Sequence, residues 1–167
     1  MSWRPAILGV PCPPEMHDNP TNPGCSEPCA VRGVLRITLW QHAGVHGSLA
    51  VLGQGAADLP FTPKRVFLTY GATGSRGRHA HRGCAQVLIC TAGRLRVRAD
   101  DGRRQEEFLL CHPHQALYIP PMVWTEQFDH SEDAVLLVLA SHPFDSADYL
   151  HNRDEWLAQL DRQEHQG

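Results

Sequence analysis

Short apolar segments separated by turn residues follow one another through most of this chain, and their spacing is the strongest constraint on its fold. In Arg94–Arg98 apolar and basic residues alternate strictly, which is typical of a strand with one face in solvent. Asp100-Asp101-Gly102 lies between two such segments and predicts a hairpin turn. The pattern predicts an all-β sandwich or barrel. The expected strands are Val34–Leu39, Ser48–Leu52, Arg65–Tyr70, Ala85–Cys90, Arg94–Ala99, Glu106–Leu110, Ala116–Ile119, Trp124–Phe128 and Ala134–Ala140.

Both ends of the chain differ from this pattern. Residues 1–32 are rich in proline, which disfavours helix and central strand, so we expect a proline-rich N-terminal extension there. Residues 33–167 are expected to form a single domain, which suits a chain of 167 residues. Asn152–Gln163 reads as a short amphipathic helix capped by Asn152, and Asp145–Tyr149 as a helical turn.

The charge balance excludes some classes of partner. A net charge of -3 gives no general reason to expect nucleic acid or an acidic membrane surface. The sequence contains no apolar run of the length that spans a bilayer, and its N-terminus does not resemble a secretion signal, so we expect a cytoplasmic protein. In that compartment the six cysteines are expected to be reduced. Cys12, Cys25 and Cys29, with His17 among them, match no standard zinc-finger spacing.

Two histidines carry the chemistry that the sequence shows most clearly. His79 and His81 lie one residue apart and lead into the apolar run Gln86–Cys90. Side chains alternate along a strand, so both imidazoles should point to one face. Imidazoles move protons near neutral pH and also bind metals, and the spacing leaves both uses open, together with a merely structural one.

The His-x-His pair before a strand resembles the first motif of the cupin fold, a small jelly-roll β-barrel. The positions of that motif correspond here to His79, His81, Gln86 and Gly93. In a metal-binding cupin a carboxylate stands where this chain has Gln86, and a later histidine stands where it has Thr125. Two of the four usual ligands are therefore missing. We expect no functional metal and no cofactor, and acid–base chemistry instead.

A more specific resemblance covers roughly Val34 to Leu160. The chain is similar to the sugar-nucleotide 3,4-ketoisomerases, or WxcM-like cupins, in several motifs that occur in the same order. These are Arg76–Arg82, Gln86–Cys90, Leu117–Ile119, Pro121–Trp124 with Glu126, and Ala134–Ser141 running on to Asp145 and Asp148-Tyr149. The resemblance implies a homodimeric, metal-free cupin with a short C-terminal helix. It also implies dTDP-4-keto-6-deoxyglucose as substrate, whose ketone moves from C4 to C3.

The resemblance implies that His79 and His81 are catalytic, one carrying a proton between adjacent carbons and the other polarising an oxygen. The sequence does not assign the two roles. Arg65, Arg76 and Arg82 are the arginines nearest the motif and are candidates for binding the pyrophosphate. Alternation places Arg78 in solvent instead. Tyr118 and Trp124 are candidates for contacting base or sugar, with a core role equally open for both.

Three positions depart from the family pattern. His46 stands at an arginine position, and it either replaces a lost donor or is an ordinary surface residue. Phe67 stands where relatives tend to have tyrosine, which removes a hydroxyl that can assist proton transfer. Thr125 stands where relatives often have histidine or arginine. Three other functions therefore remain open: a sugar-nucleotide epimerase of the cupin class, a catalytically silent dTDP-sugar-binding cupin, and a metal-dependent dioxygenase.

Overall fold

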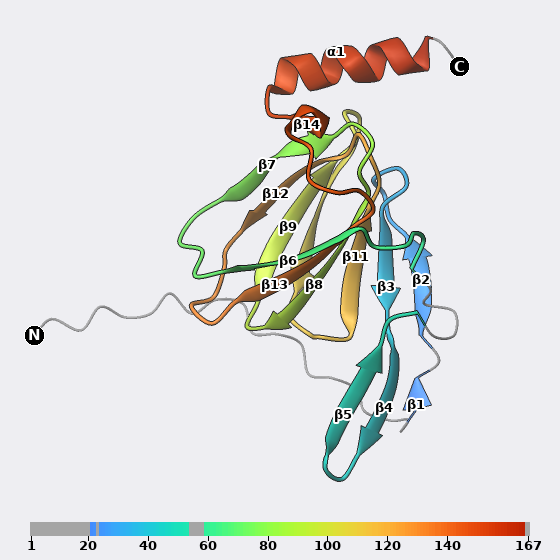
Figure 1. The fold of residues 1–167 in the computed structure, drawn as a ribbon, viewed down its shortest axis with the longest axis vertical. Coiled ribbons are helices and arrows are strands. Elements are labelled where there is room, and N and C mark those ends of the chain that lie inside the picture. Colours follow the sequence, from blue (N-terminus) through green and yellow to red (C-terminus); the bar gives the residue numbers. More distant parts are fainter. Residues whose placement is uncertain (1–20, 23, 54–58, 166–167) are drawn as a thin grey trace, which may run out of the picture.

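The computed structural model describes residues 21–22, 24–53 and 59–165, and nearly all of its regular structure is β-strand (Figure 1). The strands are β1 (Thr21–Asn22), β2 (Cys25–Pro28), β3 (Leu35–Thr38), β4 (Trp40–Gly44), β5 (Gly47–Val51), β6 (Arg65–Tyr70), β7 (Arg76–His81), β8 (Gln86–Ala92), β9 (Leu95–Asp100), β10 (Gln105–Leu110), β11 (Gln115–Ile119), β12 (Trp124–Phe128), β13 (Val135–Ala140) and β14 (Tyr149–Leu150). A 3-10 helix (Ser146–Asp148) and one α-helix, α1 (Arg153–Glu164), complete it.

Two sheets face each other. One has the order β2-β3-β11-β8-β13-β6, and the other has the order β10-β9-β12-β7-β14. The main core lies between them, because its buried side chains come from both sheets, such as Leu88 and Leu136 from the first and Val97 and Phe108 from the second. The predicted all-β jelly roll with a short C-terminal helix is confirmed.

Alternation along the six-stranded sheet separates two apolar clusters. Leu88 and Leu136 face the inner core, whereas the neighbouring Val87 and Ile89 belong to a second cluster on the outer face. On β6 the same alternation leaves Arg65, Phe67 and Thr69 partly buried and their neighbours exposed. A residue of this sheet can therefore reach the interior only from every second position.

The C-terminal helix closes one end of the sandwich (Figure 1). The side chain of Asn152 accepts hydrogen bonds from the backbone N–H groups of Asp154 and Glu155, as the predicted cap requires. Trp156 is fully buried, and its indole N–H donates to the Met122 carbonyl at 2.8 Å. Trp156 and Leu160 pack against Ala80, the residue between the two histidines, so α1 supports β7 from behind.

Some expectations need correction. The segment Trp40–Gly44 was not expected to be a strand, yet it forms β4 and pairs with β5 in a hairpin that projects from the sandwich (Figure 1). Cys111 is disulfide-bonded, so the prediction of reduced cysteines is wrong for it, whereas Cys25, Cys29, Cys84 and Cys90 are free thiols. Sequence spacing did not show this, because a disulfide depends on which thiols the fold brings together.

The predicted N-terminal extension is described only in part. Residues 1–20, including Cys12 and His17, lie outside the described residues. Residues 25–28 form β2, which pairs with β3 at the edge of the six-stranded sheet. The boundary between residues 32 and 33 stays a prediction. No helix in the described part of the chain is long and apolar enough to cross a membrane.

Candidate active site

Strand β7 holds both histidines on the inner side of the five-stranded sheet. The ring centroids of His79 and His81 lie 5.0 Å apart, and the rings meet edge to face at 85°. The pairing of β7 with β12 shifts register here, since Thr125 pairs with His79 and Glu126 with Gly77. Arg78 is the extra residue of this bulge, with a φ of 55°, and it is exposed as predicted. The bulge sets the direction of the neighbouring His79.

Gly77 is required at this bulge for two reasons. Its φ is 79°, which favours glycine, and a Cβ at this position would lie only 3.1 Å from the Thr125 carbonyl oxygen. Any larger residue would therefore push β12 away from β7 beside the histidines.

His81 is paired with an aspartate from the far end of the chain. Its Nδ1 lies 2.6 Å from a carboxylate oxygen of Asp148, and His81 is only 6% exposed. The other oxygen of Asp148 accepts the Gly83 backbone N–H at 2.7 Å. The Nε2 of His81 lies 3.0 Å from the amide nitrogen of Gln86. An ionised carboxylate requires a proton on Nδ1, so Nε2 carries the lone pair and accepts from Gln86.

Burial keeps both histidines neutral at pH 7. It lowers the pKa of His79 to about 4, with smaller contributions from the like charges of His81 and His151 and an opposing hydrogen bond to the Gly77 backbone. Burial also lowers the pKa of His81, although the hydrogen bond and charge of Asp148 work against it. Burial raises the pKa of Asp148, but hydrogen bonds from Gly83 and His81 outweigh it, so the pKa is lowered and the carboxylate is ionised.

A cavity of about 130 Å³ is lined by His79 and by Gln86, the hydrogen-bond partner of His81. His79, Gln86, Gln127 and Tyr149 supply polar groups to its wall, and Arg76 adds an exposed guanidinium. Its apolar wall consists of Phe67, Leu136 and Val138. Polar groups that can bind hydroxyl and keto oxygens therefore face an apolar surface across a small space.

Strand β14 brings Tyr149 directly onto the histidine pair. Tyr149 pairs with His81 across the two strands, and its ring centroid lies 4.4 Å from that of His81 and 4.9 Å from that of His79. The exposed His151 stacks on the Tyr149 ring at 5.6 Å. A guanidinium nitrogen of Arg65 donates to the Tyr149 hydroxyl at 3.4 Å.

Five of the predicted site residues meet at this place. They are His79, His81, Arg65, Arg76 and Thr125, which is buried and pairs with His79. Arg65 points inward from β6 and contacts Tyr149, so it lies deeper than a pyrophosphate-binding arginine at the cavity mouth is expected to lie.

Four predicted residues are not brought to the cavity. Tyr118 packs in the outer-face cluster, since alternation along β11 directs Leu117 inward instead. Trp124 packs against Trp156 of α1, with ring centroids 5.5 Å apart. Arg82 forms an ion pair with Glu155 at 2.7 Å and thus ties β7 to α1. His46 is exposed in the turn between β4 and β5.

The sequence did not single out Asp148, which pairs with His81, or Tyr149 and Gln127, which line the cavity. Asp148-Tyr149 belongs to the motifs that carried the resemblance, but Asp148 lies 67 residues after His81, and local pattern does not reveal a contact over that separation. Gln127 is two residues beyond Thr125, so period two along a strand was the available signal.

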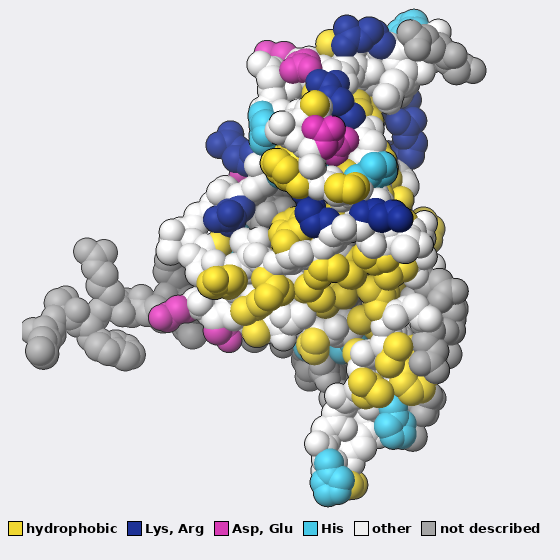
Figure 2. All heavy atoms as spheres, viewed as in Figure 1, with side chains coloured by type: hydrophobic (Ala, Val, Ile, Leu, Met, Phe, Trp, Pro, Cys, Tyr) yellow, Lys and Arg dark blue, Asp and Glu magenta, His cyan; other side chains and the backbone are white. Residues whose placement is uncertain are grey.

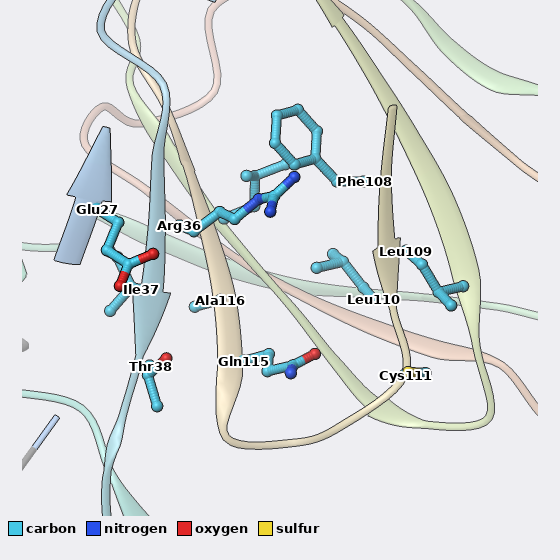
Figure 3. A pocket seen from close by; sticks show the side chains of 11 residues that line it. Glu27, Arg36, Ile37, Thr38, Phe108, Leu109, Leu110, Cys111, Gln115 and Ala116 are labelled. Atoms are coloured by element: carbon cyan, nitrogen blue, oxygen red, sulfur yellow. The ribbon is translucent and has the colours of Figure 1, made fainter. Parts of the chain in front are cut away.

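A larger cavity of about 350 Å³ lies elsewhere, between β3, β11 and β10 (Figure 3). One of its charged side chains, Arg36, forms an ion pair with Glu106 at 2.8 Å and lies over the Phe108 ring. The rest of its wall includes aliphatic side chains such as Ile37 and Leu110. None of the candidate site residues lines it.

His81, Cys84 and Asp148 also place possible metal ligands within 4.8 Å of one another. The 2.6 Å contact between His81 and Asp148 is a hydrogen bond, and it leaves no space for an ion between these two atoms. We therefore treat this group as a hydrogen-bonded pair with a neighbouring thiol.

Comparisons with known proteins found a matching family and a similar curated protein. Residues 33–161 match the family described as FdtA: WxcM-like, C-terminal. A TDP-4-oxo-6-deoxy-alpha-D-glucose-3,4-oxoisomerase from Aneurinibacillus thermoaerophilus is 40% identical over 112 residues, which are 66% of this chain and 80% of that protein.

Two solved structures are similar over most of the chain. A variant of the 3,4-ketoisomerase QdtA from Thermoanaerobacterium thermosaccharolyticum, in complex with TDP-4-keto-6-deoxyglucose, is 34% identical, with a TM-score of 0.74 and coverage of 80% of this chain and 97% of that one. The TDP-quinovose 3,4-ketoisomerase WlaRB from Campylobacter jejuni is 35% identical, with a TM-score of 0.71 and coverage of 77% and 99%. The family match spans more than half of the sequence, so the chain belongs to the FdtA, or WxcM-like C-terminal, family.

Proposed function

We propose that this protein is a sugar-nucleotide 3,4-ketoisomerase that converts dTDP-4-keto-6-deoxyglucose into the corresponding 3-keto-6-deoxy sugar. The observation that carries the proposal is the His81–Asp148 pair, held beside His79 at the wall of a small, partly apolar cavity. The relatives named above act on, or were solved with, sugars of this class. The reaction moves a ketone along the ring without loss of electrons, so acid–base groups suffice for it.

His81 is the base in this proposal. Its Nε2 lone pair, which accepts from Gln86 in the free protein, takes the C3 proton once substrate displaces that amide. The Asp148 carboxylate stabilises the imidazolium that forms. The same imidazolium then returns the proton to C4. His79 is neutral and lines the cavity, where it accepts a hydrogen bond from a sugar hydroxyl.

The walls of the cavity fit the rest of the substrate. The apolar side formed by Phe67, Leu136 and Val138 suits the methyl group of a 6-deoxy sugar. Exposed Arg76 at the cavity is the arginine that we assign to the diphosphate. Because the histidines are buried, hydrogen bonds to the enediol form in a medium with little water, which strengthens them.

The experiment is a product analysis by proton NMR. The purified protein is incubated with dTDP-4-keto-6-deoxyglucose, and the position of the ketone and the configuration at C3 to C5 are followed with time. We expect the ketone at C3. A ketone that stays at C4 with inversion at C3 or C5 would identify an epimerase, and dTDP binding without turnover would identify a silent binding protein; either result would overturn the proposal.

We further propose that the protein acts as a homodimer. Val66, Leu68 and Tyr70 are 57%, 55% and 73% exposed on β6, which is the edge strand of its sheet. Figure 2 shows apolar side chains gathered over this region. An exposed apolar face on an unpaired edge strand is typical of an interface.

The dimer is tested by light scattering after size exclusion. The wild type should have twice the mass of the 18.6 kDa chain. Leu68→Lys should yield a monomer, whereas Thr73→Lys at an exposed loop position should not. A monomeric wild type would contradict this proposal.

We also propose that the protein acts in the cytoplasm, since a charged dTDP-sugar does not cross a membrane unaided.

A further inference from the structure

The proposed reaction needs a proton donor that the two histidines do not supply. As the C3–H bond breaks, negative charge develops on the C4 oxygen, and this oxygen must gain a proton. His81 donates its Nδ1–H to Asp148. His79 donates its ring N–H to the Gly77 backbone, and this hydrogen bond raises the pKa of His79. Each neutral ring therefore offers only a lone pair to the substrate.

Most of the other polar groups at the cavity are too weakly acidic to be this proton donor. Gln86 and Gln127 can donate hydrogen bonds, but an amide does not give up its proton at neutral pH. The Thr69 hydroxyl is an equally poor acid. Tyr149 is the phenol among the described residues that line the cavity, and it is half-buried in ring contact with both histidines.

Arg65 provides a positive charge beside the Tyr149 hydroxyl. Its guanidinium lies over the rings of Phe67 and Phe144, at 5.1 Å and 5.5 Å from their centroids. Its Nη2 donates to the Tyr149 hydroxyl, and its Nε is buried without a hydrogen-bond partner. Among the described residues no carboxylate pairs with Arg65, so its charge remains available to a tyrosinate.

We propose that Tyr149 is a catalytic residue that transfers the hydroxyl proton between the two oxygens of the sugar, with Arg65 stabilising the tyrosinate that forms in between. The inference rests on the proposed function, because it assigns the second of the two proton transfers that a ketone shift requires. None of the residues predicted to be catalytic from the sequence performs this step.

The two steps balance as follows. First, His81 takes the proton from C3, the electron pair of the C3–H bond forms the C3–C4 double bond, and the electrons of the carbonyl π bond move to the C4 oxygen. Tyr149 gives its proton to that oxygen, so a neutral enediol lies between an imidazolium and a tyrosinate.

In the second step, Tyr149 takes the proton from the C3 hydroxyl, whose electron pair forms the new C3 carbonyl. The electrons of the double bond accept the proton of His81 at C4. One hydrogen has then moved from carbon to carbon and one from oxygen to oxygen. Both protein groups are restored, and no oxidant or reductant is used.

Phe67 also fits this assignment. Its ring lines the cavity without a hydroxyl and supports the guanidinium of Arg65. The guanidinium that stacks on Phe67 contacts Tyr149. In this chain the phenol hydroxyl at the cavity thus belongs to Tyr149 on β14 and not to residue 67 on β6.

The test is Tyr149→Phe, measured with dTDP-4-keto-6-deoxyglucose beside the wild type. Tyr118→Phe removes the same hydroxyl from β11, where the ring packs in the outer-face cluster and does not line the cavity, and is the matched control. We expect kcat of Tyr149→Phe to fall by about 10² or more, with KM within about threefold, since a proton donor acts mainly in the transition state. The melting temperature and the affinity for dTDP should match those of the wild type.

A kcat for Tyr149→Phe within threefold of an active wild type would overturn the inference and leave the proposed function intact. An inactive wild type would instead overturn the proposed function. If Tyr149→Phe does not fold, Arg65→Lys is measured, because it leaves the hydroxyl in place. A tenfold or larger loss of kcat in Arg65→Lys supports the inference, and an unchanged kcat contradicts it.

Discussion

The two cavities of this molecule differ in size and, more importantly, in what their polar groups do. In the larger one, at about 350 Å³, Arg36 is already neutralised by Glu106, and its guanidinium lies over the Phe108 ring. In the smaller one, at about 130 Å³, the polar groups are held in place by residues behind them, and the second nitrogen of His81 contacts only the neutral amide of Gln86. Asp148 does this for His81, and Arg65 for Tyr149.

The comparison shows that the reactivity of a cavity depends on how its polar groups are oriented and on which lone pairs they offer. The volume of a cavity indicates neither of these. A buried imidazole whose second nitrogen is fixed by a carboxylate has one defined tautomer and one defined direction. Arg36 and Glu106 instead neutralise each other in an ion pair at 2.8 Å. Substitutions in the two cavities should therefore have very different effects.

The largest effect is expected for His81→Asn. Loss of the base should lower kcat for the ketone shift by about 10³ or more, and deuterium from heavy water should no longer enter C3 or C4. His142→Asn, at an exposed position, is the control. A kcat of His81→Asn within tenfold of the wild type would show that another group is the base.

Asp148→Asn should have the next largest effect, at about 10² in kcat, because the imidazolium loses its counter-charge. The hydrogen bond and charge of Asp148 raise the pKa of His81. Without them His81 is protonated only at lower pH, so the acid limb of the kcat/KM profile should move to lower pH while the plateau falls. A limb that moves to higher pH would contradict the pairing seen here.

A smaller effect, on stability, is expected for His79. Its pKa is about 4 in the folded protein, below the ordinary value of 6.5, so the unfolded chain binds the proton first as the pH falls. Stability should thus be fully present above pH 6.5 and should decline between pH 6.5 and 4. In His79→Asn the melting temperature should depend less on pH over this range. An identical slope in wild type and variant would show that His79 is not buried as described.

The smallest effect is expected in the larger cavity. Arg36→Ala removes a largely exposed ion pair, whose loss costs less than about 1 kcal/mol of unfolding free energy. Denaturant titration should show this small change, and kcat/KM for the keto-sugar should equal that of the wild type. A tenfold loss of kcat/KM would show that the larger cavity is part of the active site.

The sequence was informative wherever local pattern decides structure. Alternating residues located most strands, and Asn152 located the start of α1. It was less informative about contacts between distant segments, since neither β4 nor the Asp148–His81 pair follows from local pattern. For Tyr118 and Trp124 it left a ligand contact and a core role equally open, because the face of a strand that turns inward depends on the partner sheet or helix.

The central claim is that the keto-sugar binds in the smaller cavity with its reacting carbons at His81. A crystal structure with dTDP-4-keto-6-deoxyglucose bound to an inactive variant such as Tyr149→Phe tests it most directly. We predict the hexose between His79, Gln127 and Tyr149, with C3 about 3.5 Å or less from Nε2 of His81. A hexose in the cavity between β3 and β10, or one whose C3 and C4 point away from His81, would contradict the account.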